Sequence, residues 1–376
     1  MKIAYCTDFP DIQKNRAFNR SITKKYPGDI WSSIFAELAK QEGIEVTTGD
    51  IALTNVKSGR LSPTEILVIQ SQDASDGTEL VKLGALPFIL IAMEVPLYSY
   101  PFYKRLPKIA PQFKNRILYP GLFNNFKAKS GKNFDLHFPS FDKNSSFSFK
   151  KWGERKFLVM VVANKYFEKN FPWPLPKYPS EHFDYLKEKL LQQRSPIRKA
   201  AVKKEVVSKR LEAIEYFGFQ GSLDLFGSGW DNLSILPYKW RHRLKSILTK
   251  LQPTRIKDKI RTISNYKFSI CFENTVYPGV ITEKIIDCFV AGVIPIYLGA
   301  PDVVEFIPKG SFIDMRQFKS WQEIDGYLHQ LNEKDALKMI SKGQNFLKSP
   351  KGELFSYQSM AQRVMKLIEI ELSKSH

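Results

Sequence analysis

The sequence has few residues of the kinds that bind metals or form disulfides. Its 376 residues include three cysteines and five histidines, with no Cys-x-x-Cys pair and no HExxH motif. Cys6, Cys271 and Cys288 lie within or beside apolar strand and helix patterns. This distribution argues against a disulfide-stabilised domain and against a zinc site, and it predicts buried thiols in a reducing compartment.

The sequence also lacks long apolar runs and the common motifs that bind a phosphate or a metal–diphosphate complex. No segment approaches the about 18 to 20 uninterrupted apolar residues of a membrane span. The N-terminal residues MKIAYCTDF lead directly into a strand pattern without a signal peptide, so we expect a cytoplasmic protein. Neither Asp-x-Asp nor a P-loop occurs. We therefore expect no required metal or cofactor, beyond non-specific stimulation by divalent ions.

Acidic residues are scarce relative to basic ones. The chain has 38 Asp and Glu against 57 Lys and Arg, which gives a net charge of +19. Basic residues concentrate in segments 187–210 and 239–261, and Asp258 is the single acidic residue of the second. These segments favour an anionic partner, such as a phosphorylated small molecule, a phosphorylated glycolipid or an anionic membrane surface met peripherally, or they are ordinary solvated helix faces. Nucleic acid is not expected, because no recognisable binding module accompanies the charge.

Short apolar runs alternate with helical patterns, which predicts α/β domains with mostly parallel sheets. We expect an N-terminal domain over 1–150, with a polar linker at 141–149, and a second α/β domain over 151–348. The C-terminal segment 349–376 contains an amphipathic helix that is expected to pack back on the N-terminal domain. In the second domain, a proline-rich insertion precedes a charged helix predicted from about Glu181 to Phe217. Other predicted elements are Lys2–Cys6, Ile30–Gln41, Ile44–Thr48, Ile66–Ile69, Pro87–Ala92, Arg116–Tyr119, Lys156–Ala163 and Leu223–Phe226.

The most informative segment is 267–301, KFSICFENTVYPGVITEKIIDCFVAGVIPIYLGAP, which reads as strand, loop, helix and buried strand. Thr282 stands at the N-cap position of the predicted helix, and Glu283 and Lys284 follow in its first turn. Helix N-termini attract phosphate through their N–H groups and dipole, and Lys284 adds a full positive charge. An ordinary strand–loop–helix with a surface lysine fits the same pattern.

The string FENTxxPGxITEK, followed by IPIYLGAP, resembles the donor-binding signature of the α-1,3/1,4-fucosyltransferases, glycosyltransferase family 10. The resemblance implies a GT-B fold of class α/β, with two doubly wound Rossmann-like domains and an interdomain cleft. It also implies Asn274, Glu283 and Lys284 as GDP-fucose ligands, with Glu283 toward the ribose and Lys284 toward the diphosphate. Family members usually carry a tyrosine where this chain has Val280, and Tyr277 is a candidate to replace that contact.

The strand pattern Pro87–Ala92 runs into Met93-Glu94-Val95-Pro96. A carboxylate at the C-terminal end of a buried parallel strand lies where open α/β sheets bind ligands, and partial burial would make it a stronger base. The family has a Glu-x-Pro in the corresponding place, so the resemblance implies Glu94 as the general base. The alternative is a carboxylate that only accepts backbone hydrogen bonds. Tyr98 and Tyr100, in a proline-punctuated loop, are either acceptor-binding or core aromatics.

Arg210, on the helix before the strand Leu223–Phe226, matches the phosphate-binding arginine of the family, with Lys203, Lys204 and Lys209 as alternatives. The expected function is inverting transfer of fucose from GDP-fucose to an oligosaccharide or glycolipid. The expected linkage is α-1,3 or α-1,4 to GlcNAc or Glc in a surface glycan or lipopolysaccharide. Two alternatives stay open: a transferase for another GDP-sugar, and a catalytically decayed basic protein that binds glycans or polyanions.

Overall fold

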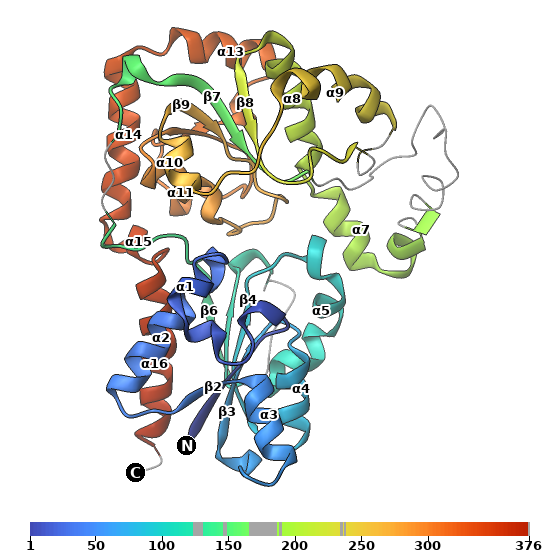
Figure 1. Ribbon diagram of the computed structural model, residues 1–376, viewed down its shortest axis with the longest axis vertical. Helices are drawn as coiled ribbons and strands as arrows, with labels where there is room; N and C mark the ends of the chain where they lie inside the picture. Colours follow the sequence, from blue (N-terminus) through green and yellow to red (C-terminus); the bar gives the residue numbers. More distant parts are fainter. Residues whose placement is uncertain are drawn as a thin grey trace. The chain divides into compact units, whose positions relative to one another are not determined.

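The computed structural model describes residues 1–122, 131–145, 149–164, 186–187, 190–233, 236 and 238–374. The chain divides into two compact units (Figure 1). Unit 1 comprises Met1–Ser145 and Pro350–His376, and unit 2 comprises Ser146–Ser349. The division predicted after residue 150 thus lies after Ser145, within the predicted linker. Of that linker, residues 146–148 lie outside the described part.

Unit 1 is built on a six-stranded parallel sheet with the strand order β2-β1-β3-β4-β5-β6. The edge strand β6 was not predicted, because its residues are mostly exposed and form no apolar run. The strands are β1 (Lys2–Cys6), β2 (Val46–Thr48), β3 (Ile66–Ser71), β4 (Leu86–Ala92), β5 (Asn115–Leu118) and β6 (Lys132–Asp135).

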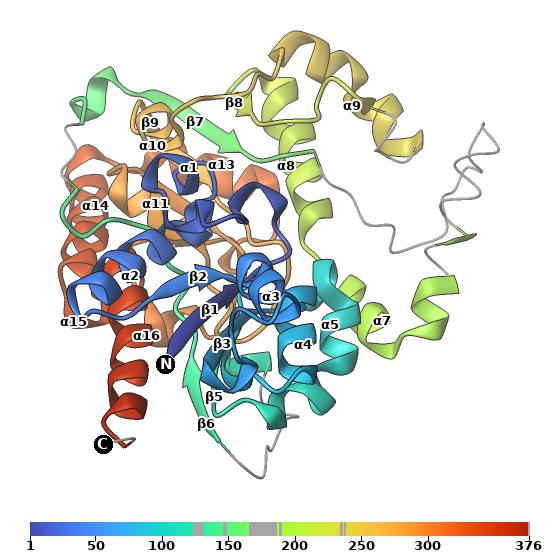
Figure 2. The ribbon, with the colours of Figure 1, turned by 60° about the horizontal axis from the view of Figure 1, so that its bottom comes forward.

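Helices cover both faces of this sheet. Helices α2 (Ile30–Gln41) and α16 (Tyr357–Leu372) pack together on one face (Figures 1 and 2). The apolar stripe of α16, which includes Met360, Val364 and Ile368, is buried. The other face carries α3 (Gly49–Lys57), α4 (Ser75–Lys82) and α5 (Pro96–Ile109), and the short helices α1 (Arg20–Thr23) and α15 (Pro350–Glu353) complete the unit.

Unit 2 contains a five-stranded parallel sheet with the order β11-β10-β9-β7-β8. Its core gathers large apolar side chains such as Phe217, Phe268 and Phe272. The strands are β7 (Lys156–Val161), β8 (Leu223–Phe226), β9 (Tyr266–Ile270), β10 (Ile294–Tyr297) and β11 (Ile313–Asp314). Its helices include α7 (Pro196–Lys203), α8 (Val207–Gln220), α9 (Tyr238–Leu251), α10 (Lys259–Ile263), α11 (Glu283–Val290), α12 (Val303–Phe306), α13 (Trp321–Gln330) and α14 (Glu333–Leu347).

Two local predictions were wrong. The charged helix predicted up to Phe217 is interrupted between α7 and α8, because Glu205 pairs with Thr275 in an isolated antiparallel bridge. The predicted start of that helix and the prolines before it fall in 165–185, outside the described residues. The proline-punctuated segment after Glu94 is helix α5 rather than a loop. A kink at Ser99 (φ −129°, ψ 38°) lets the helix accommodate Pro101.

All three cysteines are free and buried, as predicted. No helix in the described part of the chain is long and apolar enough to cross a membrane.

Candidate functional site

The segment singled out by the sequence forms a loop at the carboxyl edge of the unit 2 sheet. Residues 271–282 connect the central strand β9 to helix α11, and the chain then returns to the sheet as the neighbouring strand β10. Open parallel sheets bind their ligands at this edge, beyond the carboxyl ends of the strands. The local fold therefore positions the loop and the first turn of α11 where a ligand is expected.

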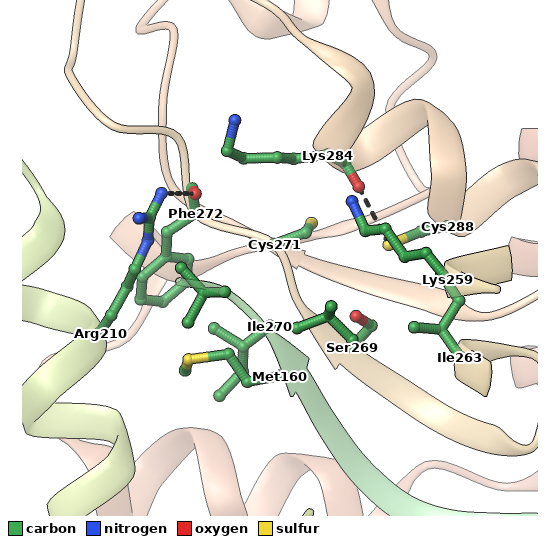
Figure 3. A pocket seen from close by; sticks show the side chains of 12 residues that line it. Met160, Arg210, Lys259, Ile263, Ser269, Ile270, Cys271, Phe272, Lys284 and Cys288 are labelled. Carbon is green, nitrogen blue, oxygen red and sulfur yellow. Dashed lines mark hydrogen bonds between the residues drawn. The ribbon is translucent and has the colours of Figure 1, made fainter. Parts of the chain in front are cut away.

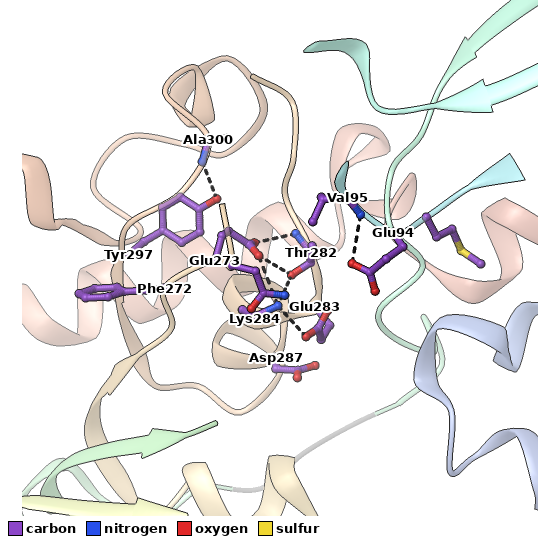
Figure 4. A network of polar contacts seen from close by, with 12 residues as sticks. Glu94, Val95, Phe272, Glu273, Thr282, Glu283, Lys284, Asp287, Tyr297 and Ala300 are labelled. Carbon is purple, nitrogen blue, oxygen red and sulfur yellow. Dashed lines mark hydrogen bonds and ion pairs between the residues drawn. The ribbon is translucent and has the colours of Figure 1, made fainter. Parts of the chain in front are cut away.

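A buried carboxylate, Glu273, organises this loop (Figure 4). Its side chain is 1% exposed. One carboxylate oxygen accepts a hydrogen bond from Thr282 N at 2.8 Å, and the other accepts from Thr282 Oγ1 at 2.8 Å. Lys284 Nζ lies 3.4 Å from the same carboxylate. Glu273 thus ties the start of the loop to the start of α11.

The predicted N-cap position of Thr282 is confirmed, but its side chain has a different role from a capping residue. Thr282 occupies the N-cap position with extended backbone, but its side chain makes no capping hydrogen bond. Its hydroxyl donates to Glu273 instead and accepts from Lys284 Nζ at 3.0 Å. Gly299 permits this arrangement, because a Cβ there would lie 2.5 Å from Glu273 Cγ. Sequence reasoning missed Glu273, although it is the Glu of the FENT string.

Glu283 and Lys284 form the exposed end of the network. Lys284 Nζ lies 3.1 Å from Glu283 Oε1. The side chain of Lys284 is 17% exposed and that of Glu283 is 26% exposed. Burial opposes ionisation of Glu283, but the charges of Lys284 and Lys259 outweigh it and lower its pKa to about 2. Burial likewise opposes the charge of Lys284, yet Glu283 and Glu273 raise its pKa above the usual value. Both side chains are therefore charged at neutral pH.

A small cavity of about 20 Å³ lies beside this network (Figure 3). Arg210, Lys259 and Lys284 line it, together with the carboxyl end of β7 and residues 269–272 of β9 and its loop. That volume holds about one water molecule, so the feature is a cation-lined recess rather than a nucleotide-sized pocket. The three cationic residues line the recess from different elements, and Lys259 and Lys284 are each paired with a carboxylate. A phosphate that binds at this sheet edge, beside the N-terminus of α11, would compete with those carboxylates.

Lys259 was not predicted as a site residue, although the sequence placed it in the basic segment 239–261. Its Nζ forms an ion pair with Asp287 of α11 at 2.7 Å. Burial disfavours the charged lysine, but Asp287 and Glu283 raise its pKa above the usual value. The position of Lys259 follows from the contact between α10 and α11, which joins segments that the sequence alone does not relate.

Arg210 lies in the first half of α8 and is 3% exposed. Its Nη2 donates to Phe272 O at 2.5 Å and to Asn274 Oδ1 at 2.9 Å. Asn274 also accepts a hydrogen bond from Val206 N through its backbone carbonyl, at 3.2 Å. Two predicted site residues are thus in direct contact, and Arg210 both lines the recess and holds the loop.

The three alternatives to Arg210 lie elsewhere on the surface. Lys203 is exposed, and Lys209 pairs with Glu212 at 2.7 Å. Lys204 Nζ lies 4.2 Å from the ring centroid of Tyr277. None of the three lines the recess.

Tyr277 and Val280 are the two ends of a turn, in which Val280 N donates to Tyr277 O at 3.2 Å. Val280 is 1% exposed and belongs to the core. Tyr277 is also buried, and burial raises its pKa to about 12, so the hydroxyl keeps its proton. The structure places Tyr277 against Lys204, and it does not place Tyr277 on the lining of the recess.

In unit 1, Glu94 follows β4 at the carboxyl edge of that sheet. Its side chain is exposed, which corrects the expected partial burial. Glu94 Oε1 accepts from Val95 N at 3.0 Å, and its backbone carbonyl accepts from Tyr103 Oη at 2.8 Å (Figure 4). Tyr98 and Tyr100 lie on α5 and are partly exposed, whereas the next aromatic, Phe102, is fully buried. Both side chains thus reach solvent in part, although the hydroxyl oxygen of Tyr98 is itself buried.

Among the described residues, no group of three or more His, Cys, Asp and Glu could hold a metal ion. Cys271 and Cys288 line the recess as thiols, which donate to Ile296 O at 3.5 Å and to Lys284 O at 3.3 Å. Burial raises the pKa of Cys271 well above its usual value, so this thiol stays protonated.

Comparisons with known proteins place these residues in a family context. Residues 203–339 match "Glycosyltransferase family 10 (fucosyltransferase) C-term". An α-(1,3)-fucosyltransferase of Helicobacter pylori is 37% identical over 107 residues, which are 28% of this chain and 22% of that protein. The mouse 4-galactosyl-N-acetylglucosaminide 3-α-L-fucosyltransferase 9 is 37% identical over 83 residues, 22% of this chain and 23% of that protein. The matched segments thus span about a fifth of the relatives' length.

A solved structure of Anabaena HepE in complex with UDP and glucose resembles the whole chain, with a TM-score of 0.56 and 10% identity. The alignment covers 98% of this chain and 99% of that one. This likeness concerns the fold alone. Together with the two parallel α/β sheets, it confirms the predicted GT-B fold class.

Proposed function

We propose, on the premise that this chain carries the C-terminal domain of glycosyltransferase family 10, that it transfers fucose from GDP-fucose to a sugar hydroxyl with inversion. The observation that carries the proposal is the recess lined by Arg210, Lys259 and Lys284 beside the N-terminus of α11. All three cations lie within the matched segment 203–339.

In the proposed reaction, the diphosphate of the donor binds at the first turn of α11, outside the recess, which at about 20 Å³ is too small to hold it. Lys284 and Arg210 offset the negative charge that grows on the departing diphosphate, because preorganised cations act without reorganising during the reaction. Glu283, ionised by its cationic neighbours, accepts hydrogen bonds from the ribose hydroxyls. Asn274 and Tyr277 complete the donor contacts.

Glu94 serves as the general base in this proposal. It takes the proton of the acceptor hydroxyl while that oxygen attacks the anomeric carbon of fucose. The bond from this carbon to the diphosphate breaks, and GDP leaves with the bonding electrons. Support comes from the position of Glu94 after β4 and from the hydrogen bonds that fix its loop. Tyr98 and Tyr100, which follow on α5, are proposed to contact the acceptor sugar.

The test is transfer from GDP-fucose to N-acetyllactosamine and lipopolysaccharide oligosaccharides, read by mass. Glu94→Gln should lower kcat by about 10² to 10⁴ and leave GDP affinity unchanged, since a positioned base contributes that much. Glu65→Gln, an exposed carboxylate of the same unit, is the matched control. Wild-type turnover in Glu94→Gln would remove this residue from the mechanism. Absence of any transfer and of donor hydrolysis would contradict the whole proposal.

The acceptor is proposed to be GlcNAc or Glc in a surface glycan or lipopolysaccharide, linked α-1,3 or α-1,4. We also propose peripheral contact with an anionic membrane surface, supported by exposed basic residues on and after α9, namely Lys245, Lys250, Arg255, Lys257 and Arg261. In flotation assays, the protein should bind phosphatidylglycerol vesicles, and added salt should weaken this binding. Binding that does not change with salt concentration or with the charge of the vesicles would refute the proposed membrane contact.

A further inference from the structure

Unit 2 has a second hollow that the proposed reaction does not use. It is an open groove of about 810 Å³ between α8, α9 and the start of α13. It shares no lining residue with the cation-lined recess. The groove is lined by Glu212, Glu215, Tyr216, Phe219, Gln220, Trp240, Arg243, Ser246, Ile247 and Trp321.

Helical periodicity builds the two walls of the groove. On α8, Glu212, Glu215 and Phe219 follow one another at three- and four-residue spacing and therefore share one face. Buried residues of α8 such as Arg210 and Phe217 occupy the remaining circumference. On α9, Trp240, Arg243 and Ile247 repeat the same spacing, and α8 contacts α9 directly.

The edge of the groove carries an exposed aromatic side chain, Phe219. Phe219 is 78% exposed, the largest value among the exposed large apolar residues of the described chain. A single exposed phenyl ring is not unusual by itself, but an apolar surface that continues over several residues of a concave region is typical of a binding site. Tyr216 and Trp321, both partly exposed, extend the aromatic surface into the groove.

Fixed polar groups stand beside these rings. Arg243 Nε donates to Glu215 Oε1 at 2.5 Å, and a second hydrogen bond joins Arg243 Nη2 to the other carboxylate oxygen. The guanidinium lies 4.7 Å from the ring centroid of Trp240. This bidentate pair holds hydrogen-bond donors and acceptors in a defined orientation next to the apolar rings.

The charge and size of the groove select a class of ligand. The charged groups of the lining are compensated, because Glu215 pairs with Arg243 and Glu212 pairs with Lys209 at 2.7 Å, although the chain as a whole carries +19. Phosphate-rich ligands are therefore disfavoured here. The volume falls within the range of small-molecule sites, about 300 to 1,000 Å³, and is small for a protein interface. Aromatic faces beside carboxylates and a guanidinium suit the apolar ring faces and the hydroxyls of a neutral sugar.

We propose that this groove binds neutral saccharide units of a long glycan acceptor, apart from the unit that receives fucose. This inference rests on the proposed function, since it makes the groove an anchoring subsite of the same substrate. A long glycan would then bind at two places on one enzyme, which raises its effective concentration at the site of transfer. A short acceptor would gain nothing from the groove.

The test uses the full chain with saturating GDP and N-acetyllactosamine oligomers of increasing length. Saturation-transfer NMR should show that the wild type and Lys284→Ala bind a long oligomer more tightly than the disaccharide, and this difference should disappear in Phe219→Ala. With GDP-fucose as donor, Phe219→Ala should raise KM for a long oligomer about tenfold or more, because the variant loses the apolar contact that the phenyl ring makes with the bound oligomer. KM for the disaccharide should not change. Phe219→Tyr, which keeps the ring, should behave as wild type. Phe9→Ala is the matched control, because Phe9 is 55% exposed in unit 1.

Equal loss for short and long acceptors in Phe219→Ala, or no loss for either, would overturn the inference. Oligomer binding that is absent in the wild type would also overturn it, and a protein partner would then be the better occupant. Failure of the groove leaves transfer to the disaccharide intact. Failure of the proposed function abolishes transfer to every acceptor.

Discussion

Replacing Glu273 by glutamine tests whether this buried carboxylate organises the site. Gln retains the size of the side chain and one carbonyl oxygen, but it removes the negative charge and one of two acceptors. Thr282 donates twice to Glu273, at 2.8 Å each, and Lys284 Nζ lies at 3.4 Å. The amide would point a donor at a group that itself donates, so the loop and the start of α11 should separate.

The expected size follows from the burial of the pair. Removing one partner of a buried charge pair costs about 3 to 5 kcal/mol. Lys284 keeps Glu283 at 3.1 Å, and glutamine keeps one acceptor, so the lower end, about 3 kcal/mol, is expected. For a unit of this size, each kcal/mol shifts Tm by about 2 to 4 °C. The transition of unit 2 should therefore move down by about 6 to 12 °C.

The assay is thermal unfolding with and without GDP, followed by GDP titration calorimetry at a temperature where the variant is folded. Glu305→Gln, an exposed carboxylate in the same unit, serves as control and should unfold like the wild type. Thr282→Val removes the hydroxyl but keeps the backbone N–H. A double-mutant cycle with Glu273→Gln should give a coupling of about 1 to 2 kcal/mol. Two results would refute the role assigned to Glu273: a Tm of Glu273→Gln equal to that of the control, or a double-mutant cycle with a coupling energy of zero.

Three other changes test the charges. Lys284→Ala should weaken GDP binding by more than about tenfold in calorimetry, since it removes a charged phosphate contact, and unchanged affinity would contradict its assignment. Lys259→Met should lower both GDP affinity and Tm, because it leaves Asp287 without its 2.7 Å partner, and a variant with wild-type values would exclude Lys259 from the site. Burial, partly offset by the Gly77 N–H, raises the pKa of Asp76 from 3.8 to about 7. The folded chain therefore holds a proton that the unfolded chain releases as pH rises from about 4 to 7, so the free energy of unfolding should fall over that interval. Asp76→Asn should remove up to about 4 kcal/mol of this pH dependence in denaturant titrations, and an unaltered profile would show that Asp76 ionises normally.

The sequence predicted the elements whose side chains alternate or repeat with a clear period. β9 and α11 fall where the pattern of 267–301 placed them, because an apolar strand and an amphipathic helix carry their own signal. The edge strand β6 carried none, since its residues face solvent. Helix α5 was predicted as a loop because its prolines outweighed its apolar spacing, and the kink at Ser99 reconciles the two.

The site was predictable only as far as it is contiguous in sequence. Lys284 and Asn274 belong to one motif, and Arg210 could be matched only through the family pattern. Lys259 enters the recess through packing of α10 on α11, which no local pattern encodes. Glu273 was within the motif but was overlooked, because a carboxylate beside a phosphate-binding segment does not suggest a phosphate ligand. Its role is to hold Thr282 and Lys284, and that role becomes visible only in the hydrogen bonds.

The charges around the recess explain how such a site can be stable before any ligand binds. Lys284 is matched by Glu273 and Glu283, and Lys259 is matched by Asp287. Unmatched cations at these positions would repel one another across a partly buried surface and destabilise unit 2. In the proposed reaction, a diphosphate would therefore compete with carboxylates for Lys284, and part of its interaction energy would replace existing ion pairs. Affinity for GDP should consequently depend on the carboxylates as well as on the cations. Of the two carboxylates that pair with Lys284, Glu273 can be altered without removing a predicted ligand.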